Sequence, residues 1–247
     1  MNERQPLLDA IACRFAENNF LSEKIGKKVT NAFAEGITLF GVLSTQVGES
    51  DGEWVDKYGV KYSADRRKLI WCTNWDLEDY SILNGVQVIC DSAFYDCSSL
   101  QSIHIPDSVT CIEDYAFSKC SSLQSIHIPN SVTSIGEYAF KGCSSLQHIH
   151  ISNSVTDIWR NTFEHCSSLQ NIQIPNSVTS IKEYAFLGCF SLQRIHIPNS
   201  VTIIWRDAFL GCSASFDVDV NNPHYTSIDR ALYSKDRKKL IKGNTKK

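Results

Sequence analysis

Several kinds of segment are missing from the 247-residue sequence. No apolar stretch approaches the roughly 20 residues that a membrane-spanning helix needs. The first nine residues carry Glu3, Arg4 and Asp9 and no uninterrupted apolar run, which argues against a secretory signal peptide. No Asn-x-Ser/Thr glycosylation acceptor occurs. We therefore expect a cytoplasmic protein without a membrane span, with export by a non-classical route as the alternative.

The motifs of common enzyme and metal sites are missing as well. There is no Walker-type glycine-rich loop before a lysine and no His-Glu-x-x-His. No two cysteines have the Cys-x-x-Cys spacing of a zinc site. The net charge of -3 is too small to indicate nucleic acid as the partner. We predict a non-enzyme with no catalytic residues, no metal ligands and no cofactor.

The sequence does contain a repeat with a period of 23 residues. A fixed period of this length is typical of solenoids, in which each unit packs against its neighbours. Two of the recurring positions are the phenylalanines Phe94, Phe117, Phe140, Phe163, Phe186 and Phe209 and the cysteines Cys97, Cys120, Cys143, Cys166, Cys189 and Cys212.

Each repeat begins with the apolar order Leu-x-x-Ile-x-Ile, whose alternating end predicts a strand. Ile126 and Ile128 would share the buried face of that strand, and Ser125 and His127 the outward face. A Pro-Asn pair then predicts a turn and a return path. Residues 136–142, which end on a glycine, predict a short helical turn.

The complete pattern is Cys-x-x-Leu-x-x-Ile-x-Ile-Pro-x-Ser-Val-Thr-x-Ile-x-x-x-Ala-Phe, and it resembles the BspA-like leucine-rich-repeat family, also called the Treponema-type repeat. The resemblance covers residues 82–220 in about six copies. It implies an α/β solenoid with a curved parallel sheet on the concave face and short strands and helical turns on the other side. It also implies recognition of proteins or cell surfaces, without catalytic residues.

Ten cysteines could indicate a disulfide ladder, a metal site or buried thiols. Stacked repeats lie about 4.8 Å apart, but equivalent side chains point the same way, which suits a disulfide dihedral poorly. Free cysteine is among the most buried residue types. We expect the six recurring cysteines to be buried and reduced, as in a cytosolic protein.

The chain outside the repeats predicts three further segments. Residues 1–47 contain two apolar stripes at helical spacing and are predicted to form a helical N-terminal cap, with a separate partner-binding helical module as the alternative. Residues 48–81 predict a loop and a β-hairpin that lead into the array. Residues 221–247 predict a second hairpin and a basic tail, which we expect to be solvated.

The outward positions of the strands are the variable surface of the array, and we predict that a partner binds there. These outward positions form two columns, which begin at Ser102 and His104. At a fixed period of 23 residues the columns end at Asp217 and Asp219. Their histidines could form a metal, anion or pH-sensitive site, or could simply be exposed polar residues copied with the repeat. The predicted partner-binding residues are Ser102, His104, Ser125, His127, His148, His150, Asn171, Gln173, Arg194 and His196.

Two Trp-Arg pairs occupy one position, two repeats apart, and are secondary candidates. Trp159-Arg160 and Trp205-Arg206 would lie at the edge of the array, where exposed Trp and Arg often anchor partners. The alternative is that both Trp rings lie flat over neighbouring repeats.

Three hypotheses for function follow. The first is a protein–protein interaction module that binds through the concave face of the solenoid. The second is an exported adhesin or host-directed effector. The third and least favoured is a thiol- or metal-dependent enzyme, because His165 and Cys166 are adjacent in sequence but nothing places that imidazole on that thiol. The sequence leaves the partner and the oligomeric state open.

Overall fold

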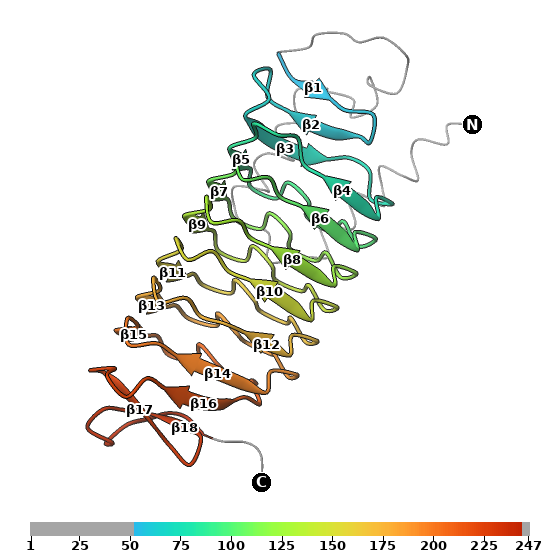
Figure 1. The fold of residues 1–247 in the computed structure, drawn as a ribbon. Helices are drawn as coiled ribbons and strands as arrows, with labels where there is room; N and C mark the ends of the chain where they lie inside the picture. Colours follow the sequence, from blue (N-terminus) through green and yellow to red (C-terminus); the bar gives the residue numbers. More distant parts are fainter. Residues whose placement is uncertain (1–51, 244–247) are drawn as a thin grey trace, which may run out of the picture. The chain divides into compact units, whose positions relative to one another are not determined.

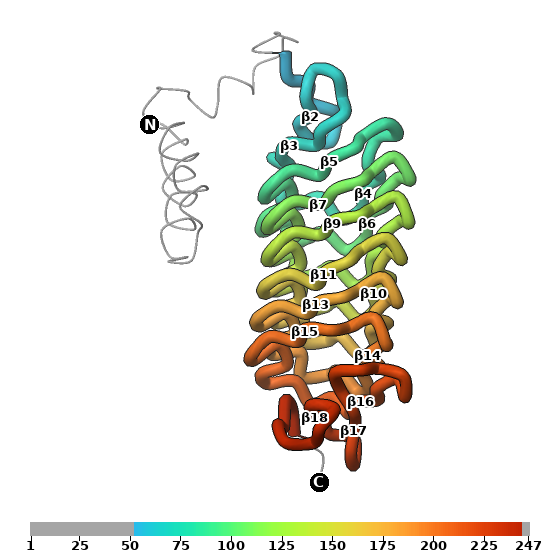
Figure 2. The backbone as a smooth tube through the Cα atoms, turned by 90° about the vertical axis from the view of Figure 1, so that its left-hand side faces the viewer, coloured from blue at the N-terminus to red at the C-terminus, as the bar shows by residue number. Residues whose placement is uncertain are grey.

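The structure, a computed structural model, describes residues 52–243. The helical cap predicted for residues 1–47 lies outside these described residues. From residue 52 to residue 243 the chain forms strands and turns, with no helix. Figures 1 and 2 show successive coils stacked on one another, with the labelled strands arranged in two rows.

The first row consists of strands of two to four residues, which lie one above another along one side of the stack (Figure 1). Their pairing is parallel, and His148 of one coil lies opposite Asn171 of the next. One repeat of 23 residues therefore makes one coil. The strands are β4 (Asp79–Ser81), β6 (Ser102–His104), β8 (Ser125–His127), β10 (His148–His150), β12 (Asn171–Ile172), β14 (Arg194–Ile197) and β16 (Ser215–Val218).

The second row consists of two-residue strands that also pair in parallel. A Pro-x-Ser-Val turn connects the rows, and in one coil the Val132 amide donates to the Pro129 carbonyl (3.0 Å). The strands are β5 (Val88–Ile89), β7 (Cys111–Ile112), β9 (Ser134–Ile135), β11 (Asp157–Ile158), β13 (Ser180–Ile181) and β15 (Ile203–Ile204).

The short helical turns predicted for the rest of each repeat are not present. Tyr138 (φ 58°) and Gly142 (φ 73°) have left-handed backbone conformations, which interrupt a right-handed helix. The amides of this segment instead donate to the next coil, as Phe117 does to the carbonyl of Ala139 (2.8 Å). Because pairing between coils satisfies these amides, the segment forms successive turns, and the prediction of a helix was wrong here.

Identical apolar side chains stack along the interior of the array. Phe94, Phe117, Phe140, Phe163 and Phe186 are each at most 1 % exposed, and Phe209 is 2 % exposed. Neighbouring rings of this column lie 5.4 to 5.7 Å apart between centroids and are close to parallel. One coil could not bury its Leu, Ile, Val and Phe alone, and stacking forms one continuous core.

Antiparallel strands flank the parallel rows. On the N-terminal side β1 (Trp54–Val55), β2 (Val60–Tyr62) and β3 (Lys68–Cys72) are antiparallel, and β3 pairs in parallel with β5. On the C-terminal side β17 (Tyr225–Ile228), β18 (Ala231–Ser234) and β19 (Leu240–Lys242) form a separate antiparallel sheet. Both sets contain the same turn, in which a serine hydroxyl donates to an aspartate two residues later (2.6 Å).

No helix in the described part of the chain has the length and apolar character required to cross a membrane.

Candidate functional site

We use the term strand face for the outward side chains of the first row, from β4 to β16. The strands of this row alternate exposed and buried residues, so that Ser125 and His127 are exposed while Ile126 is buried. All ten predicted partner-binding residues are exposed. The alternation arises because successive side chains of a strand point to opposite faces. The structure therefore brings these ten residues to one surface.

Three histidines form the centre of the strand face. His127 lies opposite His150 on the neighbouring strand, and their rings stack with centroids 4.9 Å apart and planes 5° apart. His148, two residues before His150 on β10, pairs with Ser125 on one side and Asn171 on the other. Within residues 52–243 none of the three imidazoles makes a hydrogen bond or an ion pair. Their ring nitrogens are therefore available to a partner.

The C-terminal end of the strand face is an ionic cluster. Asp217 accepts a hydrogen bond from Arg194 (2.8 Å), and its carboxylate lies 3.1 Å from Nδ1 of His196. The hydrogen bond with His196, followed by that from Arg194, lowers the pKa of the Asp217 carboxyl below its ordinary value, although partial burial opposes the shift. Asp217 therefore stays ionised in mildly acidic solution.

The register of the last coil corrects the sequence analysis. A constant period of 23 residues places Asp219 after His196, but Asp217 pairs with His196, at a separation of 21 residues. The segment between Cys212 and β16 is two residues shorter than its counterpart in the preceding coil. Phe216 is buried and packs edge-on against Phe209 with ring centroids 4.9 Å apart. This ring contact fixes which residues of β16 face inward.

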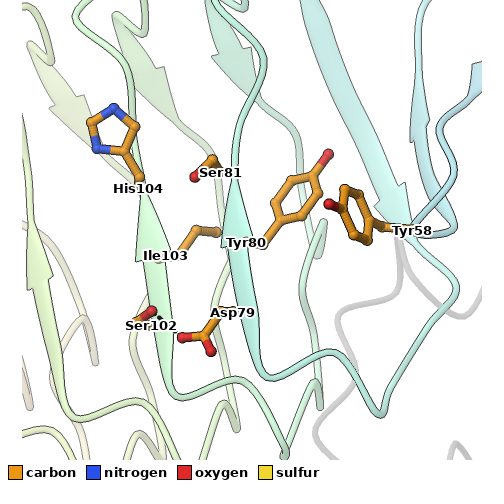
Figure 3. Close-up of a pocket in the computed structure, with 7 residues that line it drawn as sticks. All are labelled: Tyr58, Asp79, Tyr80, Ser81, Ser102, Ile103 and His104. Atoms are coloured by element: carbon orange, nitrogen blue, oxygen red, sulfur yellow. Dashed lines mark hydrogen bonds between the residues drawn. The ribbon is translucent and has the colours of Figure 1, made fainter.

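The N-terminal end of the strand face is an open hollow of about 340 Å³. Figure 3 shows Asp79 and Ser102 hydrogen-bonded on one side and His104 and Ser81 on another. Tyr58 is 46 % exposed and meets Tyr80 edge to face at 5.8 Å. The Tyr80 hydroxyl donates to Asp56 (2.6 Å) and contacts the Tyr62 hydroxyl, and burial raises its pKa.

Sequence reasoning missed most of this hollow, because Tyr58 comes from a non-repeating loop between β1 and β2 that carries no periodic signal. It also missed a second feature that the sequence does display. A column of exposed glutamines precedes the strands at the same period of 23 residues: Gln101, Gln124, Gln147, Gln170 and Gln193.

The secondary candidates lie on the second row, around Lys182. Trp159 follows β11 and Trp205 follows β15, and they are 38 % and 46 % exposed. The Lys182 ammonium lies over both rings, 5.3 Å from the Trp159 centroid and 5.6 Å from the Trp205 centroid. It also forms a 3.8 Å ion pair with Asp157. The two rings therefore enclose a cation of the chain itself, a contact absent from both sequence-based alternatives.

The cysteine column has a structural role. All six cysteines of this column are at most 1 % exposed, and all six are free thiols. Burial raises the pKa of the Cys120, Cys143, Cys166, Cys189 and Cys212 thiols, which disfavours the reactive thiolate. Four of them donate to a phenylalanine carbonyl at 3.1 to 3.2 Å: Cys120 to Phe94, Cys143 to Phe117, Cys166 to Phe140 and Cys189 to Phe163.

Two further observations bear on catalysis. In the described part of the chain no group of three His, Cys, Asp or Glu side chains could hold a metal ion. Residues 48–52 read Gly-Glu-Ser-Asp-Gly, which matches the pattern of a nucleophile elbow, a serine between a strand and a helix. Ser50 lies outside the described residues, and the first element described after it is the strand β1, which begins at Trp54.

Comparisons with known proteins agree with this geometry. The leucine-rich repeat protein of Eubacterium ventriosum has a TM-score of 0.56 and 25 % identity over 67 % of this chain and 51 % of its own. The leucine-rich repeat protein of Bacteroides ovatus has a TM-score of 0.51 and 25 % identity, and the match covers 70 % of this chain and 51 % of the B. ovatus chain. The T. pallidum leucine rich repeat protein has a TM-score of 0.54 and 24 % identity, and the match covers 64 % of this chain and 88 % of the T. pallidum chain.

The chain thus spans about half the length of the E. ventriosum and B. ovatus proteins. No curated protein matches the sequence. The model of the BspA type leucine rich repeat region matches residues 71–169 and 156–242, with six copies of the repeat. Together with the stacked parallel strands and their 23-residue spacing, this match shows that the chain belongs to the BspA-type leucine-rich-repeat family.

Proposed function

We propose that the chain is a non-catalytic protein–protein interaction module that binds its partner through the strand face. One observation carries the proposal: one outward column of this face changes from serine to His148, Asn171 and Arg194 along the array, while the interior repeats the same residues. Variation concentrated on one surface of a regular scaffold is typical of recognition by repeat proteins.

The strand face has the size and chemistry of a protein-binding surface. Seven strands about 4.8 Å apart extend over roughly 29 Å. The face offers hydroxyl, amide and imidazole groups and one guanidinium, and arginine is enriched at binding hot spots. The hollow at β4 and β6 adds a recess beside the exposed ring of Tyr58.

We also propose a cytoplasmic location. The support is the column of free, buried cysteines, which fits a reducing compartment. Cell fractionation with an antibody against the chain tests this proposal independently of binding, and recovery from the cell surface or the medium would favour the adhesin or effector alternative.

Site-specific photo-crosslinking tests the binding surface. A photoreactive residue placed at His127, on the strand face, is compared with one placed at Thr133, which is exposed on the opposite side of the same coil. Crosslinks to one protein from position 127 and none from position 133 are the expected result. Crosslinking only from position 133 would show that the partner binds elsewhere.

The identified partner then allows a quantitative test. Replacing His150 and Arg194 together by alanine should weaken binding without lowering the melting temperature, because both side chains are exposed. The matched control replaces Lys238 and Lys239, which are exposed outside the strand face and should alter only the salt dependence. Loss of binding in the control but not in the first variant would contradict the assignment.

A further inference from the structure

Histidines are concentrated on the strand face. Five of the seven histidines of the chain lie there, together with Arg194. From β6 to β14 no outward side chain is acidic, because the acidic residues lie at the two ends. Asp79 on β4 accepts a hydrogen bond from Ser102, and Asp217 on β16 is paired with Arg194 and His196.

The central histidines have the geometry of a subsite. The rings of His127 and His150 stack in parallel at 4.9 Å, so their edges lie side by side at the surface. His148 projects from the same face of β10 as His150, about 7 Å along the strand. No acidic side chain of the described residues pairs with any of the three. A group that accepts hydrogen bonds can therefore approach several imidazoles at once.

We propose that His127, His148 and His150 form an anion subsite that binds the carboxylates of an acidic segment of the partner protein. The inference rests on the proposed function and gives the chemistry of the partner. Histidine gains its charge between about pH 5 and pH 8, so binding strengthens as the pH falls.

The stacked pair strengthens the coupling between protonation and binding. Two imidazolium rings 4.9 Å apart repel each other, and a carboxylate that accepts hydrogen bonds from both offsets the repulsion. Binding of the acidic segment is therefore coupled to proton uptake. The other charged or titratable groups on this side of the array include Tyr58, Glu78, Asp79, Tyr80, His104, Arg194, His196 and Asp217.

An acidic protein fits this face better than a nucleic acid does. Nucleic acids are held by several lysines or arginines that neutralise successive phosphates. The strand face has one permanently charged cation, Arg194, and it is already paired with Asp217. Histidine, a residue that gains its charge near neutral pH, suits a short run of carboxylates.

The probe for the test is a fluorescently labelled oligoaspartate of about twelve residues, because aspartate, with a reference pKa of about 3.9, stays ionised at about pH 5.5. Fluorescence anisotropy should show binding at least about tenfold tighter at pH 5.5 than at pH 7.5, since each charge-assisted hydrogen bond contributes about a factor of ten or more. The triple variant with His127→Gln, His148→Gln and His150→Gln should lose this pH dependence. The control variant carries His165→Gln and His224→Gln, away from the strand face, and should keep it.

Three outcomes would overturn the proposal. These are no binding of the oligoaspartate at about pH 5.5, an unchanged pH dependence in the triple variant, and tighter binding of a single-stranded DNA of equal charge. The photo-crosslinking experiment is independent of these outcomes. A partner crosslinked at position 127 that binds equally at both pH values would refute the anion subsite and leave the interaction module intact.

Discussion

The phenylalanine column and the strand face are both built from the 23-residue repeat, but they differ in how much the residue changes from one coil to the next. Six successive coils place phenylalanine at one interior position. The outward position of the strands changes from histidine to glutamine and back along the array. In the interior each side chain packs against its own copy in the next coil, so a change in one coil disturbs three. On the strand face solvent covers the side chains, and each coil can vary alone.

The difference teaches that stacking in a solenoid does not by itself constrain the sequence. Phe117 and Phe140 stack with centroids 5.4 Å apart, and His127 and His150 stack at 4.9 Å, both nearly parallel. The first pair is buried and the second is exposed. Burial rather than ring geometry therefore separates the conserved interior of the repeats from their variable surface.

Replacing Phe140 by alanine should have the largest effect. Its ring is completely buried between those of Phe117 and Phe163, so its loss leaves a cavity bounded by two coils. We expect the free energy of unfolding to fall by about 3–5 kcal/mol, measured by urea denaturation. Phe190→Ala is the control, because that ring is 59 % exposed and should cost much less. Equal losses of unfolding free energy in the two variants would show that the phenylalanine column is not the core.

Replacing Cys143 by alanine should have an intermediate effect. The substitution removes a buried sulfur and the thiol donor that bonds to the Phe117 carbonyl at 3.1 Å. A loss of about 1–2 kcal/mol is expected from the small cavity and the missing hydrogen bond. Cys111 is only partly buried and lies outside the column, so Cys111→Ala provides the comparison. A larger loss at Cys111 would contradict the structural role of the column.

The strands and their inward and outward faces could be predicted from the sequence because they depend on local alternation. Ile126 and His127 differ in polarity at adjacent positions, which is enough to assign the two faces. The helical turn could not be predicted correctly, because the amide of Phe117 bonds to Ala139 of the next coil. Pairing between coils has no signal within one repeat.

The ends of the candidate site depend on contacts that break the period. Asp217 pairs with His196 because Phe216 packs against Phe209, a contact that a fixed spacing of 23 residues does not reveal. The hollow requires Tyr58 from a non-repeating loop. The centre of the site, which includes His127 and His150, follows the period and was predicted from the sequence.

Replacing Lys182 by alanine tests a partly exposed contact of aromatic rings on the second row of strands. Its ammonium lies over the rings of Trp159 and Trp205, both partly exposed, so each cation–π contact is weakened by solvent. We expect a loss of about 1 kcal/mol and a change in tryptophan fluorescence. Lys238→Ala, at an exposed lysine outside this row, should change neither. An unchanged stability and fluorescence in Lys182→Ala would show that the two rings do not depend on the cation.

Replacing His127 by alanine should have the smallest effect. Its ring stacks on His150 in nearly the geometry of the phenylalanine rings, but it is exposed and makes no hydrogen bond within residues 52–243. Truncating it exposes no core and leaves no buried group unpaired, so the free energy of unfolding should change by about 0.5 kcal/mol or less. Urea denaturation of His127→Ala beside Phe140→Ala thus compares two stacked rings that differ in burial. A loss as large as that of Phe140→Ala would mean that the two faces of the strand are reversed and that the candidate site lies inside the core.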